Sequence, residues 1–168
     1  MAKEDTILKD VKVELKKAIF NLTELYKHAH DFLESRNYTI VEKEYKEKVT
    51  AQGREINIKW ECEKEVDEYS KFNIAVKWTA QFINDVKVKQ GEKEIKMQSG
   101  EISVKVSSKL ILDYNEKWES HLFLKFLQSF YEKYLYIGTI TQLKEKLWED
   151  SWDLYNEIKS FLNIYKFN

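Results

Sequence analysis

The stretch FNIAVKWTAQF, residues 72–82, decides the fold, because apolar and mostly polar side chains alternate along its whole length. The first set comprises Phe72, Ile74, Val76, Trp78, Ala80 and Phe82, and the residues between them include Asn73, Lys77, Thr79 and Gln81. Successive side chains of a β-strand point to opposite faces of its sheet. A strand with one dry and one wet face is typical of an antiparallel sheet that is covered on one side only.

The segments on either side of this stretch repeat the alternation. Residues 38–50 alternate weakly and carry many charges, which favours an edge strand that is protected from aggregation. Further strands are predicted at 56–62 and 102–114, and a hairpin at 86–98 turns at Gln90-Gly91. Their apolar sets are Ile56, Ile58, Trp60 and Cys62; Val86, Val88, Ile95 and Met97; and Ile102, Val104, Val106, Leu110, Leu112 and Tyr114.

The first part of the chain allows two interpretations. The apolar residues from Ile7 to Leu33 fit one long amphipathic helix. Alternatively, residues 11–15 alternate as a strand does, and the motif FNLTEL at 20–25 is typical of a helix start, with Asn21 as the capping residue and Glu24 completing a capping box. We favour a strand near 9–19 and a helix near 22–35.

Two helices are expected at the C-terminal end. The first runs from about 117–120 to 136 and carries Phe123, Phe126, Leu127, Phe130, Tyr134 and Ile137 on one face. Gly138 interrupts it, and Thr139 with Gln142 forms a second capping-box pattern. The last helix carries Ile140, Leu143, Leu147, Leu154, Ile158, Phe161 and Leu162, with Trp148, Trp152 and Tyr155 beside this stripe.

Together these elements predict an α+β fold in a single domain over residues 1–168. We expect a curved antiparallel sheet of about six to seven strands, covered on one face by the N-terminal helix and the two C-terminal helices, in the order β-α-β6-α-α. The chain has no proline, and its four glycines lie where one periodicity gives way to another.

The composition excludes several classes of function. The net charge of −1 argues against a general nucleic-acid-binding protein. The single cysteine, Cys62, cannot form an intrachain disulfide, which suits a reducing compartment. No apolar run approaches the ~20 residues of a membrane-spanning helix, and the N-terminus is too charged for a signal peptide. We therefore expect a cytoplasmic protein without a membrane span.

The motif HAHDFLE, residues 28–34, contains two of the three histidines, but a metal site is not expected there. On a helix, His28 and His30 point to nearly opposite sides and cannot share one ion. Cys62 is expected to be a buried apolar residue and not a nucleophile. We found no phosphate-binding loop or nucleophile motif, so the sequence predicts no catalytic residue, no cofactor and no enzyme.

The aromatic residues carry the remaining functional hypotheses. Most simply they form a packed core, but they could also line a cavity between sheet and helices, since ligand pockets are mostly apolar. The candidate ligand-binding residues are Trp60, Val76, Trp78, Phe126, Phe130, Tyr134 and Trp148. The stripe of Trp148, Trp152 and Tyr155 widens the last helix beyond one sheet contact, which would suit a partner site.

The element order resembles the helix-grip fold of the START and Bet v 1-like superfamily, in which a curved antiparallel sheet grips a long C-terminal helix over an apolar cavity. The chain departs from it in having one helix at 22–35 instead of two, and two C-terminal helices instead of one. The resemblance implies a cavity and carries over no functional residue. The lysine-rich, proline-free sequence also resembles small uncharacterised archaeal proteins, which implies no activity.

Two functions follow as hypotheses. The first is a non-catalytic binding protein that holds an apolar small molecule between the sheet and the C-terminal helices. The alternative is a protein–protein interaction module, such as a homodimer, that uses the aromatic face of the C-terminal helices.

Overall fold

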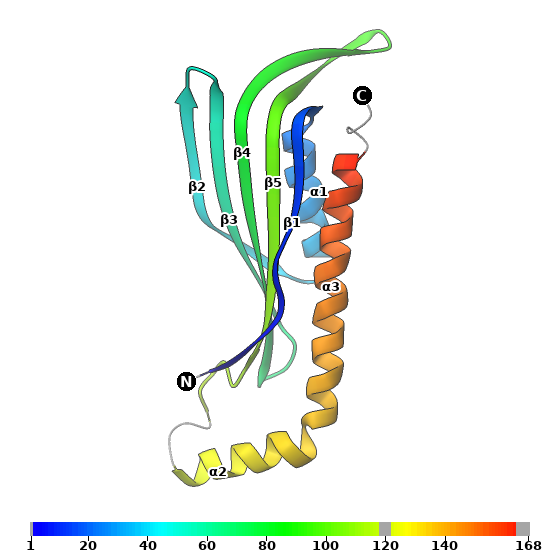
Figure 1. The fold of residues 1–168 in the computed structure, drawn as a ribbon. Coiled ribbons are helices and arrows are strands. Elements are labelled where there is room, and N and C mark those ends of the chain that lie inside the picture. Colours follow the sequence, from blue (N-terminus) through cyan, green and yellow to red (C-terminus); the bar gives the residue numbers. More distant parts are fainter. Residues whose placement is uncertain (1, 118–121, 164–168) are drawn as a thin grey trace.

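The computed structural model describes residues 2–117 and 122–163 (Figure 1). Their elements follow in the order β1 (Lys3–Phe20), α1 (Leu22–Ser35), β2 (Thr39–Thr50), β3 (Gly53–Glu65), β4 (Ser70–Gln90), β5 (Lys93–Leu112), α2 (Leu122–Phe130), the π-helical turn η1 (Tyr131–Leu135) and α3 (Ile137–Asn163). The strands form an antiparallel sheet with the order β1-β5-β4-β3-β2, so the first strand pairs with the last. The predicted α+β class and the edge position of β2 are confirmed.

The N-terminal segment is a strand followed by a helix, and the alternative of one long helix is wrong. The side chain of Asn21 accepts a hydrogen bond from the backbone N–H of Glu24 at 3.1 Å and caps α1. Phe20 and Leu25, on either side of this cap, are fully buried. The cap and the apolar residues around it fix the point where the strand ends and the helix begins.

The expected count of six to seven strands is wrong, because the predicted 86–98 hairpin belongs to the strands on either side of it. β4 and β5 are 21 and 20 residues long and pair along most of their length. A bulge between Gln81 and Asn84 gives Phe82 a positive φ of 56° and reverses the alternation, so Ile83 is buried while Phe82 is 40% exposed. The described residues therefore form a sheet of five strands.

Gly100 lies inside β5, opposite this bulge, and is not a boundary between strands. Its φ is +154°, and a Cβ atom there would lie 2.7 Å from the carbonyl oxygen of Gln81. Only glycine allows the two backbones to approach this closely. Bulges bend the strand that contains them, and the long β4–β5 hairpin curves over the helices (Figure 1).

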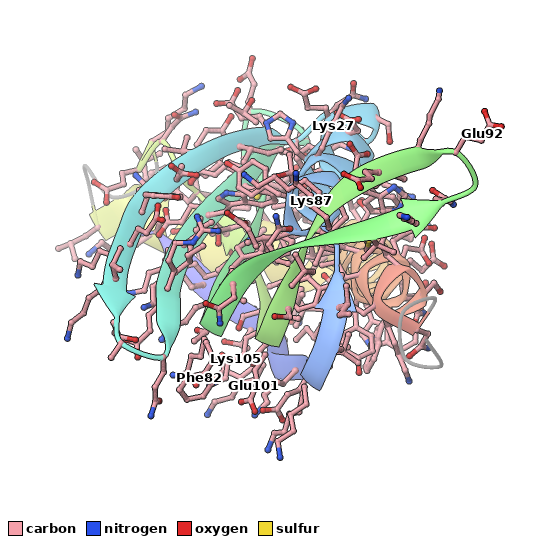
Figure 2. All side chains as sticks on the ribbon, turned by 90° about the horizontal axis from the view of Figure 1, so that it is seen from above. Lys27, Phe82, Lys87, Glu92, Glu101 and Lys105 are labelled. Atoms are coloured by element: carbon pink, nitrogen blue, oxygen red, sulfur yellow. The ribbon has the colours of Figure 1, made fainter. Side chains whose placement is uncertain are left out.

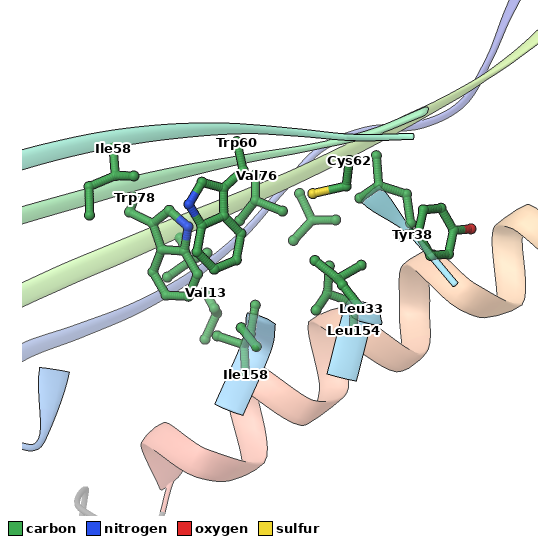
Figure 3. Packing of buried hydrophobic residues seen from close by; sticks show 14 of the residues in the cluster. Val13, Leu33, Tyr38, Ile58, Trp60, Cys62, Val76, Trp78, Leu154 and Ile158 are labelled. Atoms are coloured by element: carbon green, nitrogen blue, oxygen red, sulfur yellow. The ribbon is translucent and has the colours of Figure 1, made fainter. Parts of the chain in front are cut away.

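α1 and α3 cover one face of the sheet, as Figures 1 and 2 show from two directions. Their contributions to the core are Leu25, Ala29 and Leu33 from α1, and Leu147, Leu154, Ile158 and Leu162 from α3. The sheet contributes the inward-facing residues of the alternating strands, and Figure 3 shows Trp60, Val76 and Trp78 packed above Leu154 and Ile158.

α2 does not cover the sheet, which corrects the prediction that both C-terminal helices do so. It projects past one end of the sheet (Figure 1), and none of its residues is buried. The break between the two C-terminal helices, predicted at Gly138, falls at Tyr136. The backbone N–H of Tyr136 donates to the carbonyl of Tyr131 and closes the π turn. α3 therefore already includes Gly138 and Thr139, and the second capping box does not start it. Part of the predicted helix start, 118–121, lies outside the described residues.

Candidate functional site

The aromatic residues of the sheet form a packed group beneath α1. The ring centroids of Trp60 and Trp78 lie 5.1 Å apart, and Tyr26 from α1 packs edge-on against Trp60 at 4.7 Å. Trp60, Trp78 and Val76 are each at most 2% exposed. Three of the predicted ligand-binding residues are therefore brought together in the core (Figure 3).

A buried carboxylate fixes α3 against the end of α1. Asp150 is 1% exposed and accepts hydrogen bonds from Arg36 Nη1 at 2.7 Å and from the Tyr38 hydroxyl at 2.9 Å. Arg36 Nη2 also contacts Asp153 at 2.8 Å. Burial, and then the neighbouring Asp150 carboxylate, raise the pKa of Tyr38, so its hydroxyl remains a donor. This cluster therefore fixes the position of α3 relative to the end of α1.

A second polar cluster holds the other end of α3. The Tyr136 hydroxyl donates to Asp67 Oδ2 at 2.7 Å and lies 2.6 Å from Ser70 Oγ. Tyr69 stacks edge-on against Tyr131 and Tyr136, and its hydroxyl donates to Glu132. Burial raises the pKa of Tyr136 to about 12. The β3–β4 turn therefore holds η1, and α2 has a defined direction away from the sheet.

The segment 122–137, which we call the arm, exposes an apolar surface. Its exposed side chains, which we call the apolar arm face, are Leu122 (87%), Phe123 (69%), Phe126 (68%), Phe130 (50%), Tyr134 (61%), Leu135 (69%) and Ile137 (57%). In α2, the less exposed Leu124, Leu127 and Gln128 form the inner side. Gln128 donates to the Tyr69 hydroxyl at 2.9 Å, so this inner side faces the β3–β4 turn. The apolar arm face therefore points away from the sheet.

The charges on the arm are not balanced. Lys125 and Lys133 are exposed, and the arm's one carboxylate, Glu132, has a side chain only 13% exposed that is paired with Lys3 at 3.0 Å. The accessible charge of the arm is therefore positive.

The structure separates the predicted site residues into three groups. Trp60, Val76 and Trp78 lie in the core, while Phe126, Phe130 and Tyr134 are at least half exposed on the arm. Trp148 is 51% exposed on α3 and continues through Trp152 to Tyr155, with ring centroids 6.0 and 5.2 Å apart. The predicted stripe on α3 is present, and its Trp152 and Tyr155 are only partly exposed against β1.

The histidines of the 28–34 motif lie on different sides of α1. His28 Nε2 contacts Glu157 at 2.9 Å and its ring stacks on Phe161, whereas His30 lies 3.8 Å from Glu34. The potential ligand atoms of His30, Asp31 and Glu34 lie within 4.8 Å of one another on the surface. Cys62 is fully buried, and burial raises its pKa to about 12, which opposes formation of a thiolate.

Sequence reasoning missed four residues of the apolar arm face as functional candidates, because an apolar residue in a predicted helix was assigned to the core. They are Leu122, Phe123, Leu135 and Ile137. The signal was the segment LFLKFLQSF at 122–130, which has apolar residues around most of the helix. A helix with one packed face needs fewer of them.

No helix in residues 2–117 and 122–163 is both long and apolar enough to span a bilayer. Comparison of the chain with protein-family models, curated proteins and solved structures finds no match.

Proposed function

We propose that this protein is a non-catalytic docking module that attaches to an anionic lipid surface through the apolar arm face. The observation that carries the proposal is the exposure of seven large apolar side chains on one short projecting segment. Water-soluble proteins rarely expose a contiguous patch of this kind without a partner.

A lipid surface fits the composition of the arm. A helix with phenylalanine and leucine on one face and lysine beside them is typical of segments that lie in the membrane interface. Lys125 and Lys133 would each add on the order of 1 kcal/mol of attraction to an anionic surface. The arm lies at one extreme of the molecule, where the rest of the fold does not block a flat surface (Figure 1).

Charge disfavours a second copy of this chain as the occupant. Two arms packed face to face in a symmetric pair would place lysines near lysines, since Glu132 is already paired within its own subunit. Hydrogen bonding disfavours a protein partner, because protein interfaces carry about one hydrogen bond per 100–200 Å². Among its exposed side chains, the arm face offers the Tyr134 hydroxyl for this purpose.

Flotation with lipid vesicles tests the proposal. The intact protein should float with vesicles that contain phosphatidylglycerol and much less with vesicles of phosphatidylcholine alone. Burying one phenylalanine stabilises binding by roughly 1.5–3 kcal/mol, so Phe123→Ser combined with Phe126→Ser should reduce partitioning by at least about tenfold.

Val49→Ser is the matched control, because Val49 is 77% exposed on β2, away from the arm. It should float as the parent protein does. Equal flotation of the arm variant and the parent would overturn the proposal. If light scattering shows that the parent protein is a dimer and the arm variant is a monomer, a second copy of the chain is the occupant instead.

A second candidate is the binding of an apolar small molecule in the core, as the resemblance to the helix-grip fold implies. The observation that favours it is the indole N–H of Trp78, which is buried and has no hydrogen-bond acceptor among the described residues. Buried tryptophan N–H groups usually have a partner, and a guest with an oxygen atom would supply one.

Thermal shifts distinguish this candidate from the first. A guest at 100 times its Kd stabilises a fold by about 2.7 kcal/mol, which is roughly 5–11 °C for a chain of this size. Val76→Phe, which adds volume directly opposite Trp60 in the strand pairing, should abolish the shift without affecting vesicle flotation. If no fatty acid, isoprenoid or aromatic compound shifts the Tm and Val76→Phe destabilises the protein by about 1–3 kcal/mol, the core is full.

A further inference from the structure

Four lysines lie in one row across the outer face of the sheet. Lys59 pairs with Lys77, Lys77 with Lys105, and Lys105 with Lys12 in the strand register of β3, β4, β5 and β1. All four are exposed and alternate with buried or partly buried residues, and Lys105 points away from α1 and α3 (Figure 2). With strands about 4.8 Å apart, the row is roughly 14 Å long.

This arrangement opposes the stability of the sheet. Side chains directly opposite on neighbouring strands are the closest pairs on a face, and like charges there are destabilising. Within the described part of the chain, ion pairs occupy only the ends of the row, where Lys59 meets Glu44 and Lys12 meets Glu14, each at 3.3 Å. Lys77 and Lys105 in the middle have no carboxylate partner there.

A shallow hollow of about 230 Å³ adjoins the middle of the row. The neighbouring row on the same face includes Ala75 and Ser107, two small residues that leave space beside the lysines. The bulged Lys43 joins Lys59, Lys77 and Lys105 in the lining. Of the two acidic residues in the lining, Asp10 already accepts a hydrogen bond from Ser107 at 2.8 Å. The other is Glu61.

We propose that this row is a binding site for a compact anion with several phosphate groups. Lysine binds phosphate as a point charge, and a linear ligand could neutralise the central lysines, which lack partners within the sheet. The residues that flank the row on the same face are small or polar, such as Thr79, Ser103 and Asn57. They offer neither the aromatic rings on which nucleic-acid bases stack nor an apolar surface for acyl chains.

The probe for this site is inorganic tripolyphosphate, titrated calorimetrically into the intact protein. Lys77→Thr combined with Lys105→Thr should raise the apparent Kd by at least about tenfold, because two charge-assisted contacts are lost. The control pair is Lys89→Thr with Lys93→Thr, one lysine from each of the same two strands at the hairpin tip. It should change the Kd by less than about twofold.

The ligand-free proteins provide a second readout. Removing the repulsion should raise the Tm of the Lys77→Thr/Lys105→Thr variant by about 1–4 °C, while tripolyphosphate should stabilise the parent protein. Binding that both variant pairs weaken equally would show a non-specific charge effect and overturn the site. A single-stranded oligonucleotide or anionic vesicles that bind the row more tightly than tripolyphosphate would overturn the assignment of the ligand.

Discussion

α3 and the arm that precedes it are both rich in apolar residues, yet their side chains have opposite environments. Leu147, Leu154 and Ile158 of α3 are fully buried under the sheet, whereas Phe123 and Phe126 of α2 are more than two-thirds exposed. The difference comes from position. Asp150 holds α3 against the end of α1, where both helices cover the sheet, whereas α2 extends beyond the end of the sheet (Figure 1). The apolar residues of α3 stabilise the fold, and those of the arm remain accessible to a partner.

The largest expected effect comes from the residue that places α3. Asp150→Ala should destabilise the protein by about 3–5 kcal/mol, because it removes the acceptor of the Arg36 Nη1 group and of the buried Tyr38 hydroxyl. Urea denaturation measures this loss of unfolding free energy. Asp153→Ala is the control, since this 49% exposed carboxylate contacts the same arginine and should cost no more than about 1 kcal/mol. Equal costs would show that burial of the pair is not what fixes α3.

Alkaline pH should loosen the contact between the arm and the sheet. Burial raises the pKa of Tyr136 from 10.0 to about 12, so folding favours its neutral form. That contribution is fully present below pH 10 and is lost as the pH rises through 12. Unfolding free energies measured from pH 8 to 12 should therefore fall less steeply above pH 10 in Tyr136→Phe than in the parent. Parallel curves would contradict this assignment.

A smaller loss of stability is expected from a change at the start of α1, which belongs to the packed part of the molecule and not to the exposed arm. Asn21→Ala should destabilise the protein by about 0.5–2 kcal/mol, because the N–H of Glu24 loses its acceptor. Asn21→Ser should retain most of the stability. Chemical denaturation decides the result, and a neutral alanine variant would mean that the cap contributes nothing.

No effect is expected from removing metal ions. The cluster of His30, Asp31 and Glu34 is on the surface of a helix that is already anchored by Leu25, Ala29 and Leu33. The Tm should be unchanged in excess chelator. A fall of several degrees that zinc restores would show that a metal contributes to folding.

The sequence predicted what depends on local chemistry. The alternation from Phe72 to Ala80 predicted the central strand, and Asn21 with Glu24 predicted the start of α1. Non-local geometry was not predictable: the break at Phe82 looked like a strand boundary because nothing in the sequence shows that Gly100 lies opposite it.

The candidate sites were not predictable from the sequence for the same reason, because they depend on non-local geometry. An exposed phenylalanine and a buried one are identical in sequence, so the arm was assigned to the cover of the sheet. The lysine row also depends on strand register, which brings Lys12 beside Lys105 although they are far apart in the chain.

Hydrogen exchange measured by mass spectrometry, with and without vesicles that contain phosphatidylglycerol, tests the central claim most directly. The arm should gain protection when the protein binds, because its backbone is withdrawn from water, while α1 and the part of α3 after Leu147 should exchange as before. Protection confined to residues 122–137 is the result we predict. Vesicle binding that leaves this segment unprotected, or that protects the sheet instead, would contradict the account.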